Sequence, residues 1–168
     1  MELRLARASD LADIANLFLK CWKISYSEVL SQETQDAMTL ESAVELWEKA
    51  LSTNLERKTF LAIENEELIG VFRVGSDPKN SRRGHLFSLY ISPDFAGMGF
   101  GKILLEAAIG EVKAEGLDEM SLWVFDENKI AKSLYSKYGF VATGEKKTTP
   151  EWNALEIEML NPQITLKS

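Results

Sequence analysis

The chain has 168 residues, of which 45% are hydrophobic and 27% charged, and its formal net charge at pH 7 is −7. This size and composition are typical of one globular domain, so we expect residues 1–168 to form a single domain. The lone cysteine, Cys21, excludes an internal disulfide and a multi-cysteine zinc site, and it favours a reducing, cytoplasmic setting. The negative charge argues against a nucleic-acid partner, and the lack of an apolar run of about 20 residues argues against a membrane partner.

The first half of the chain predicts three strands and two helices. Alternating or β-branched residues predict the strands at 3–5, 59–63 and 68–74. Apolar residues spaced three and four apart predict the helices at 11–22 and from about 40 to 51. Two segments rich in polar or turn-forming residues, 31–36 and 75–84, are expected to be connections without regular structure.

The second half predicts strands alternating with helices. A strand over 85–91 ends before Pro93, and a glycine-rich loop then leads into a helix over 102–113. Further elements are a strand at 120–125, a helix at 128–138, and closing strands at 140–143 and 155–160 joined through 145–153. These elements are expected to form one mixed sheet with helices on its faces.

Three glycines at alternate positions, Gly97, Gly99 and Gly101, lie between a predicted strand and a predicted helix. Glycine lets the backbone turn sharply, and the N–H groups of the following helix can bind an anion such as a pyrophosphate. The spacing does not match the dinucleotide-binding fingerprint, which needs a glycine where this chain has Lys102. It does not match the P-loop either, which needs serine or threonine where this chain has Ile103. The alternative is a glycine-rich turn without a ligand.

The run LYISPDFAGMGFGK at 89–102 resembles the acyl-CoA signature of the GNAT superfamily of N-acyltransferases. A second block is similar in order and spacing to the family's other conserved block. It consists of Leu122-Trp123-Val124, Asn128, Ala131, Leu134-Tyr135 and Gly139-Phe140. The resemblance implies an α/β (α+β) fold: a mixed, mostly antiparallel twisted sheet of about six to seven strands, about four helices and splayed central parallel strands. One departure is Ala96, where the family usually has arginine or glutamine, and this puts the affinity for CoA in question.

The resemblance further implies that acetyl-CoA is the acetyl donor and that no metal takes part. Two groups of residues would bind it: the main chain at Leu89, Tyr90 and Ile91, and the loop residues Gly97, Met98, Gly99, Phe100, Gly101 and Lys102. Asn128 and Lys132, on the following predicted helix, are further expected contacts. Lys102 could equally be a solvated helix residue, and Asn128 a plain helix N-cap.

Tyr135 matches the family's general acid, which would protonate the CoA thiolate, although a tyrosine packed on the apolar face of a helix is the alternative. The base that deprotonates the acceptor amine is not identified. Some relatives place a glutamate where this chain has Trp123, which cannot accept a proton. His85 and Asp126 are candidates, with a strand end and a helix-dipole residue as their structural alternatives, and a water relay is a third route.

In this family the acceptor enters opposite CoA, where this chain has Trp22, Tyr26, Glu28 and Trp152. Residues 28–56 carry seven acidic and one basic side chain, so the aromatic and acidic residues predict a small cationic amine such as a polyamine. A solvated acidic helix face is the alternative. A protein or peptide N-terminus, an antibiotic amine, a non-catalytic acyl-CoA sensor, and an assembly module that forms a homodimer through its last strand are the other hypotheses.

Overall fold

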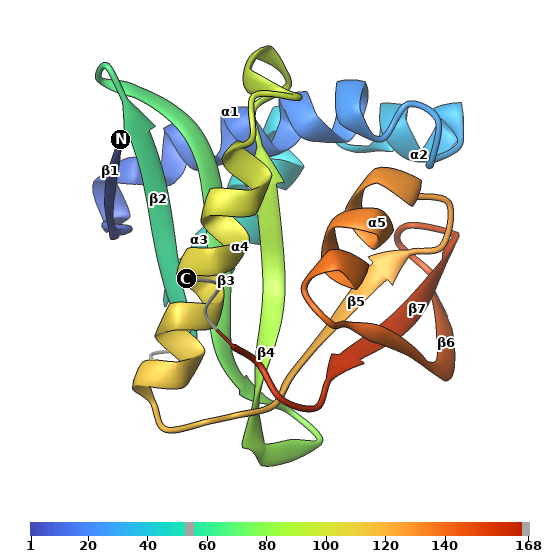
Figure 1. Cartoon of the computed structure of the whole chain (residues 1–168). Helices are drawn as coiled ribbons and strands as arrows, with labels where there is room; N and C mark the ends of the chain where they lie inside the picture. The colour runs from blue at the N-terminus through green and yellow to red at the C-terminus, as the bar shows by residue number, and fades with distance from the viewer. Residues whose placement is uncertain (53–55, 166–168) are drawn as a thin grey trace.

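The computed structural model describes residues 1–52 and 56–165, which contain one seven-stranded sheet in the order β1-β2-β3-β4-β5-β7-β6 (Figure 1). The strands are β1 Glu2–Leu5, β2 Lys58–Glu64, β3 Glu67–Asp77, β4 Asn80–Ile91, β5 Met120–Phe125, β6 Val141–Thr149 and β7 Ala154–Asn161. All neighbouring strands pair antiparallel except β4 and β5, which are parallel. The expected mixed, mostly antiparallel sheet is therefore confirmed.

Five α-helices lie in the described part of the chain: α1 Leu11–Lys20, α2 Gln32–Ala37, α3 Leu40–Ser52, α4 Phe100–Ala114 and α5 Lys129–Lys137. A wider π-helical turn, Cys21–Ser25, prolongs α1. Helices α4 and α5 cover one face of the sheet, and α1 and α3 cover the other (Figure 1). Each face buries its own apolar cluster, and each fully buried large side chain contributes about 1.5–3 kcal/mol.

Three predicted connections are in fact regular structure. Residues 32–37 form α2, which begins where Ser31 Oγ accepts the N–H of Thr34 at 3.2 Å. The segment 75–84 is mostly strand, because β3 and β4 continue to a tight turn at residues 78–79. Strand β6 extends to Thr149 because it pairs with β7 as far as Ala154. Strand pairing between distant segments is not visible in a local sequence window, so these predictions were wrong.

Strands β4 and β5 separate halfway along their length. Their pairing covers only three positions and ends where Leu86 lies beside Leu122. At the same point the β3–β4 register steps from Val74 opposite Leu86 to Arg73 opposite Ser88, so Phe87 is an extra residue on β4. A β-bulge of this kind bends its strand and increases the local twist. The bulge accounts for the splay of the two parallel strands that the family resemblance implied.

Candidate active site

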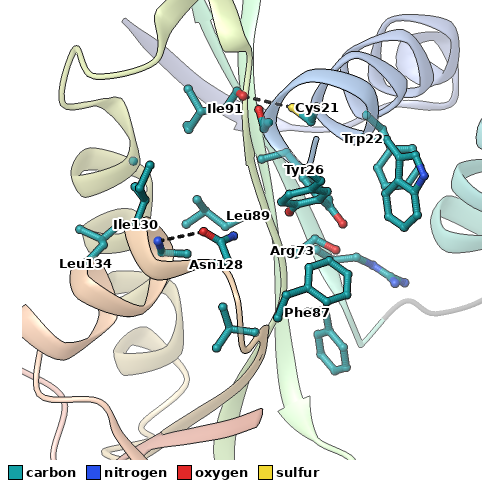
Figure 2. Close-up of a pocket in the computed structure, with 18 of the residues that line it drawn as sticks. Cys21, Trp22, Tyr26, Arg73, Phe87, Leu89, Ile91, Asn128, Ile130 and Leu134 are labelled. Carbon is teal, nitrogen blue, oxygen red and sulfur yellow. Dashed lines mark hydrogen bonds between the residues drawn. The ribbon is translucent and has the colours of Figure 1, made fainter. Parts of the chain in front are cut away.

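A cavity of about 560 Å³ lies where β4 and β5 diverge. Its wall includes the glycine loop and α5 from one face of the sheet, and the α1 side from the other. Figure 2 shows Asn128 and Leu134 on one side of β4, and Trp22, Tyr26 and Phe87 on the other. The cavity therefore connects two regions on opposite faces of the sheet.

The middle wall of the cavity is the end of β4. Ser92 donates its backbone N–H to the carbonyl of Ile69 on β3 at 2.8 Å. Because the peptide groups of an antiparallel strand alternate between its two edges, the N–H groups of Leu89 and Ile91 point away from β3. Pairing with β5 has ended by then, so the N–H groups of these two residues face the gap, whereas the Ile91 carbonyl accepts a hydrogen bond from the Cys21 thiol at 3.1 Å.

The glycine loop has the backbone shape that its sequence predicts. Gly97 has a φ of 75° and Gly99 a φ of 87°, and Gly99 is the N-cap of α4. A Cβ at either position would meet no atom within 4 Å, so open space lies over the loop. The first N–H groups of a helix have no partner within the helix, and with the helix dipole they favour an anion in this space.

Three other residues expected at the donor end lie away from the cavity wall. Met98 is largely exposed, and Lys102 lies with its Nζ 3.9 Å from the carboxylate of Glu106. Neither residue lines the cavity wall, although Met98 belongs to the glycine loop and Lys102 to the first turn of α4. Lys132 bonds both the carboxylate and the carbonyl of Asp126 at 2.8 Å. The structure therefore uses Lys132 to hold the start of α5.

Asn128 begins α5 at the edge of the cavity. Its Oδ1 accepts the N–H of Ala131 at 3.1 Å, which makes it the N-cap of α5, and it also lines the cavity. Tyr135 lies two turns further along α5, is only 7% exposed and lines the same cavity. Burial raises the pKa of Tyr135 to about 12, so its hydroxyl stays protonated at neutral pH and can act as a proton donor.

The far end of the cavity is aromatic. Trp22 lies 5.9 Å from Tyr26 and 4.9 Å from Trp152, measured between ring centroids, and all three rings line the cavity as expected. Glu28 is exposed and does not line it, so its expected place in the acceptor pocket is wrong. The turn that follows Cys21–Ser25 directs residue 28 toward solvent.

Two charged side chains that were not expected line the cavity, Arg73 on β3 and Glu156 on β7. Arg73 interrupts the apolar run from Leu68 to Gly75, which was the only sequence signal for it. Glu156 accepts a hydrogen bond from the Thr149 hydroxyl at 2.7 Å. No sequence signal separates Glu156 from the other acids of the chain, because its position depends on the pairing of β7 with β5.

Comparison with known proteins assigns the family. Residues 11–140 match the family model described as the Acetyltransferase (GNAT) family, which is more than half of the chain. The chain belongs to the GNAT acetyltransferase family. It is an N-acetyltransferase, and the family's acetyl donor is acetyl-CoA.

Relatives of this GNAT protein act on different amines. The spermidine N(1)-acetyltransferase of Thermoplasma acidophilum is 27% identical over 146 residues, 83% of this chain and 88% of that protein. The ribosomal protein bS18-alanine N-acetyltransferase of Haemophilus ducreyi is 27% identical over 114 residues, 67% of this chain and 79% of that protein. A crystal structure of the PaiA N-acetyltransferase of T. acidophilum with coenzyme A has the same fold, with a TM-score of 0.69, 23% identity, and coverage of 94% of this chain and 98% of that chain.

Neither expected base of the GNAT protein lies in the cavity wall. His85 is a buried residue rather than an exposed strand end, and its Nδ1 lies 2.7 Å from Ser121 Oγ. Burial lowers the pKa of His85 to about 4. The Lys132 ammonium lowers the pKa of Asp126, which also faces away from the cavity. Both side chains belong to structural networks, so the structure does not bring them together with Tyr135.

The described part of this GNAT protein contains neither a metal-binding cluster nor a membrane-spanning helix. Residues 1–52 and 56–165 contain no group of three or more His, Cys, Asp or Glu side chains that could hold a metal ion. None of the helices in these ranges has both the length and the apolar character needed to cross a membrane.

Proposed function

We propose that this GNAT protein transfers the acetyl group of acetyl-CoA to a primary amine by direct attack in a ternary complex. The amine nitrogen would bond to the acetyl carbon as the carbon–sulfur bond breaks, the nitrogen would lose a proton, and the sulfur would gain one. The observation that supports direct transfer is the single cavity that crosses the sheet at the β4–β5 splay. A donor on one face and an acceptor on the other would meet beside Leu89 and Ile91.

The donor would be held mainly by backbone groups. In the proposal, N–H groups from Gly97 to Lys102 bind the pyrophosphate, and the open space over Gly97 and Gly99 supports this. The main chain of residues 89–91 would bind the pantetheine arm as an added strand, and an N–H there would stabilise negative charge on the thioester oxygen. Asn128 would line the other side of the arm. Because backbone groups bind the pyrophosphate, Ala96 need not prevent binding.

Tyr135 would donate the proton to the leaving sulfur. A phenol with a pKa of about 12 is a weak acid toward an ordinary thiolate, whose conjugate thiol has a pKa of about 8.5. The cavity changes this comparison, because burial also raises the pKa of Cys21, a thiol that lines the same cavity, to about 12. Burial would likewise raise the pKa of a CoA thiol in this cavity, which favours proton transfer from Tyr135 to the leaving sulfur.

Among the described residues, Glu156 is the carboxylate that lines the cavity. In the proposal, Glu156 binds the ammonium group of the acceptor. A carboxylate beside the ammonium would orient it and could accept its proton directly or through water. The sequence predicts a polyamine as the acceptor, and the spermidine-acetylating relative and the aromatic wall of Trp22, Tyr26 and Trp152 support the broader class of small amines, which is the class proposed here. The cytoplasmic setting favoured by the lone Cys21 is part of the same proposal.

The test is release of CoA thiol from acetyl-CoA in the presence of polyamines, amino acids, aminoglycosides and short peptides. Amine-dependent thiol release, with the acetylated amine identified by mass spectrometry, is the expected result. Binding of acetyl-CoA without thiol release for any amine would contradict the proposal and favour an acyl-CoA sensor. A rate unaffected by Tyr135→Phe would remove Tyr135 from the mechanism.

A further inference from the structure

A buried, incompletely paired arginine lies at the acceptor end of the cavity. Arg73 is 8% exposed, and its side chain lines the cavity beside Phe87 (Figure 2). One hydrogen bond of its guanidinium is with the Ala50 carbonyl, at 2.8 Å from Nη2. Its Nε is fully buried without a partner. Across residues 1–52 and 56–165, no carboxylate forms an ion pair with it.

Burying the Arg73 guanidinium without an anionic partner destabilises the protein when no ligand is bound. A guanidinium has five N–H donors and no acceptor, and buried charges in proteins are normally paired. Leaving such a donor unpaired costs about 1–3 kcal/mol. The Ala50 carbonyl is a neutral partner, so it holds the guanidinium in place without neutralising its charge. An oxyanion delivered by a ligand would supply the missing partner.

Two further cations lie against rings of the cavity wall. The Arg57 guanidinium lies 4.0 Å from the centroid of Phe87, and the exposed Lys147 ammonium lies 4.3 Å from the centroid of Trp123. Both rings line the cavity. Burial is the main cause of the lowered pKa of Arg73, and the charge of Arg57 lowers this pKa further. A polyamine would bring further positive charge to this region and would be repelled.

We propose that the acceptor is an amine that also bears an oxyanion, and that the oxyanion binds Arg73. The guanidinium fork matches a carboxylate or phosphonate in two parallel hydrogen bonds. With Glu156 on the ammonium, the two charged residues of the wall match the two charges of an amino acid or related zwitterion. Trp22 and Trp152 would contact its apolar part. This inference deepens the proposed function and depends on it for the role of the amine.

The test compares matched amines in thiol release and in binding. Amino acids, their carboxamides, the corresponding aminophosphonates and spermidine are each assayed with acetyl-CoA. Binding of each to CoA-saturated protein is measured separately by calorimetry. The acids or phosphonates should exceed the carboxamides by at least about tenfold in kcat/KM and in affinity. The comparison of acids with phosphonates identifies which oxyanion the site takes.

Two variants of Arg73 and one control variant show whether Arg73 is responsible. Arg73→Met removes the charge at similar length, and it should reduce the acid-to-carboxamide ratio to about one while acetyl-CoA affinity and the far-ultraviolet circular dichroism stay unchanged. Arg82→Met is the matched control, because Arg82 is exposed on the β3–β4 hairpin, and it should keep the full ratio. Arg73→Lys keeps the positive charge and should keep part of the preference.

The outcomes separate this inference from the proposed function. Acetylation of spermidine or carboxamides at least as fast as the acids would overturn the inference and leave the acetyltransferase proposal standing. Arg73-dependent binding of acids without any thiol release would support the anion site and contradict acetyl transfer. If acids bind equally to the wild type and to Arg73→Met, Arg73 is not the anion site.

Discussion

Acidification should destabilise this protein through His85, at the point where β4 and β5 begin to separate. Ser121 Oγ donates a hydrogen bond to the Asp77 carboxylate, so Ser121 accepts one from Nδ1–H of a neutral His85. Arg83 pairs with Asp77 at 2.7 Å, and the Asp77 pKa is lowered. Asp77 therefore stays ionised at mildly acidic pH, and His85 is the member of the network whose protonation differs between the folded and the unfolded protein there.

The magnitude follows from the two pKa values of His85. In the folded protein its pKa is about 4, because burial, together with the charges of Lys147, Arg57 and Arg83, outweighs the attraction of Asp77. In the unfolded chain it is about 6.5, so the unfolded state binds more protons between these values and stability falls as the pH falls. The loss is about 2 kcal/mol between pH 7 and pH 5, and about 3 kcal/mol once the pH is below 4.

The assay is urea unfolding at pH 7 and at pH 5, with His85→Gln as the comparison. Glutamine can still donate to Ser121 and does not titrate, whereas the carboxylates titrate alike in both proteins. The wild type should therefore lose about 2 kcal/mol more than the variant over this interval. An equal loss in both proteins would refute the buried, neutral state of His85.

Three further predictions concern the site. Tyr135→Phe should lower kcat at least about tenfold, with acetyl-CoA affinity by calorimetry unchanged, because only the proton donor is removed. Gly99→Val should abolish acetyl-CoA binding in the same titration; Gly116→Val is the control, because Gly116 has a similar φ of 78° and open space but lies at the end of α4, so it should keep the affinity. Trp152→Ala should raise the KM for the amine at least about threefold in the thiol-release assay, without changing the acetyl-CoA affinity.

The Gly99 and Trp152 predictions each have a result that would contradict them. Normal acetyl-CoA affinity in Gly99→Val would mean that the glycine loop does not bind the pyrophosphate. Equal loss of affinity in Gly116→Val would assign the effect to backbone strain. A KM for acetyl-CoA that rises together with the KM for the amine in Trp152→Ala would mean that Trp152 does not lie specifically at the acceptor end.

The backbone geometry of the glycine loop and of the start of α5 was well predicted because it is local. Alternate glycines after a strand and before a helix require positive φ angles and leave the first N–H groups of α4 free, and Gly97 and Gly99 have such angles. Asn128 followed by a helix likewise predicts an N-cap, which is present. In both cases the relevant atoms belong to residues close together in the chain.

The sequence by itself determined the order of strands, glycine loop and helices, and with it the family and the expected donor. Only the tertiary structure decided which charged groups face the cavity. Arg73 and Glu156 are brought to one cavity by β3 and β7, on either side of the β4–β5 splay, while Glu28 and Asp126 point elsewhere. Burial and charge pairing depend on contacts between distant segments, and no local pattern encodes them. The acidic excess of residues 28–56 predicted a cationic acceptor, whereas the buried guanidinium of Arg73 favours an amine that also bears an anionic group.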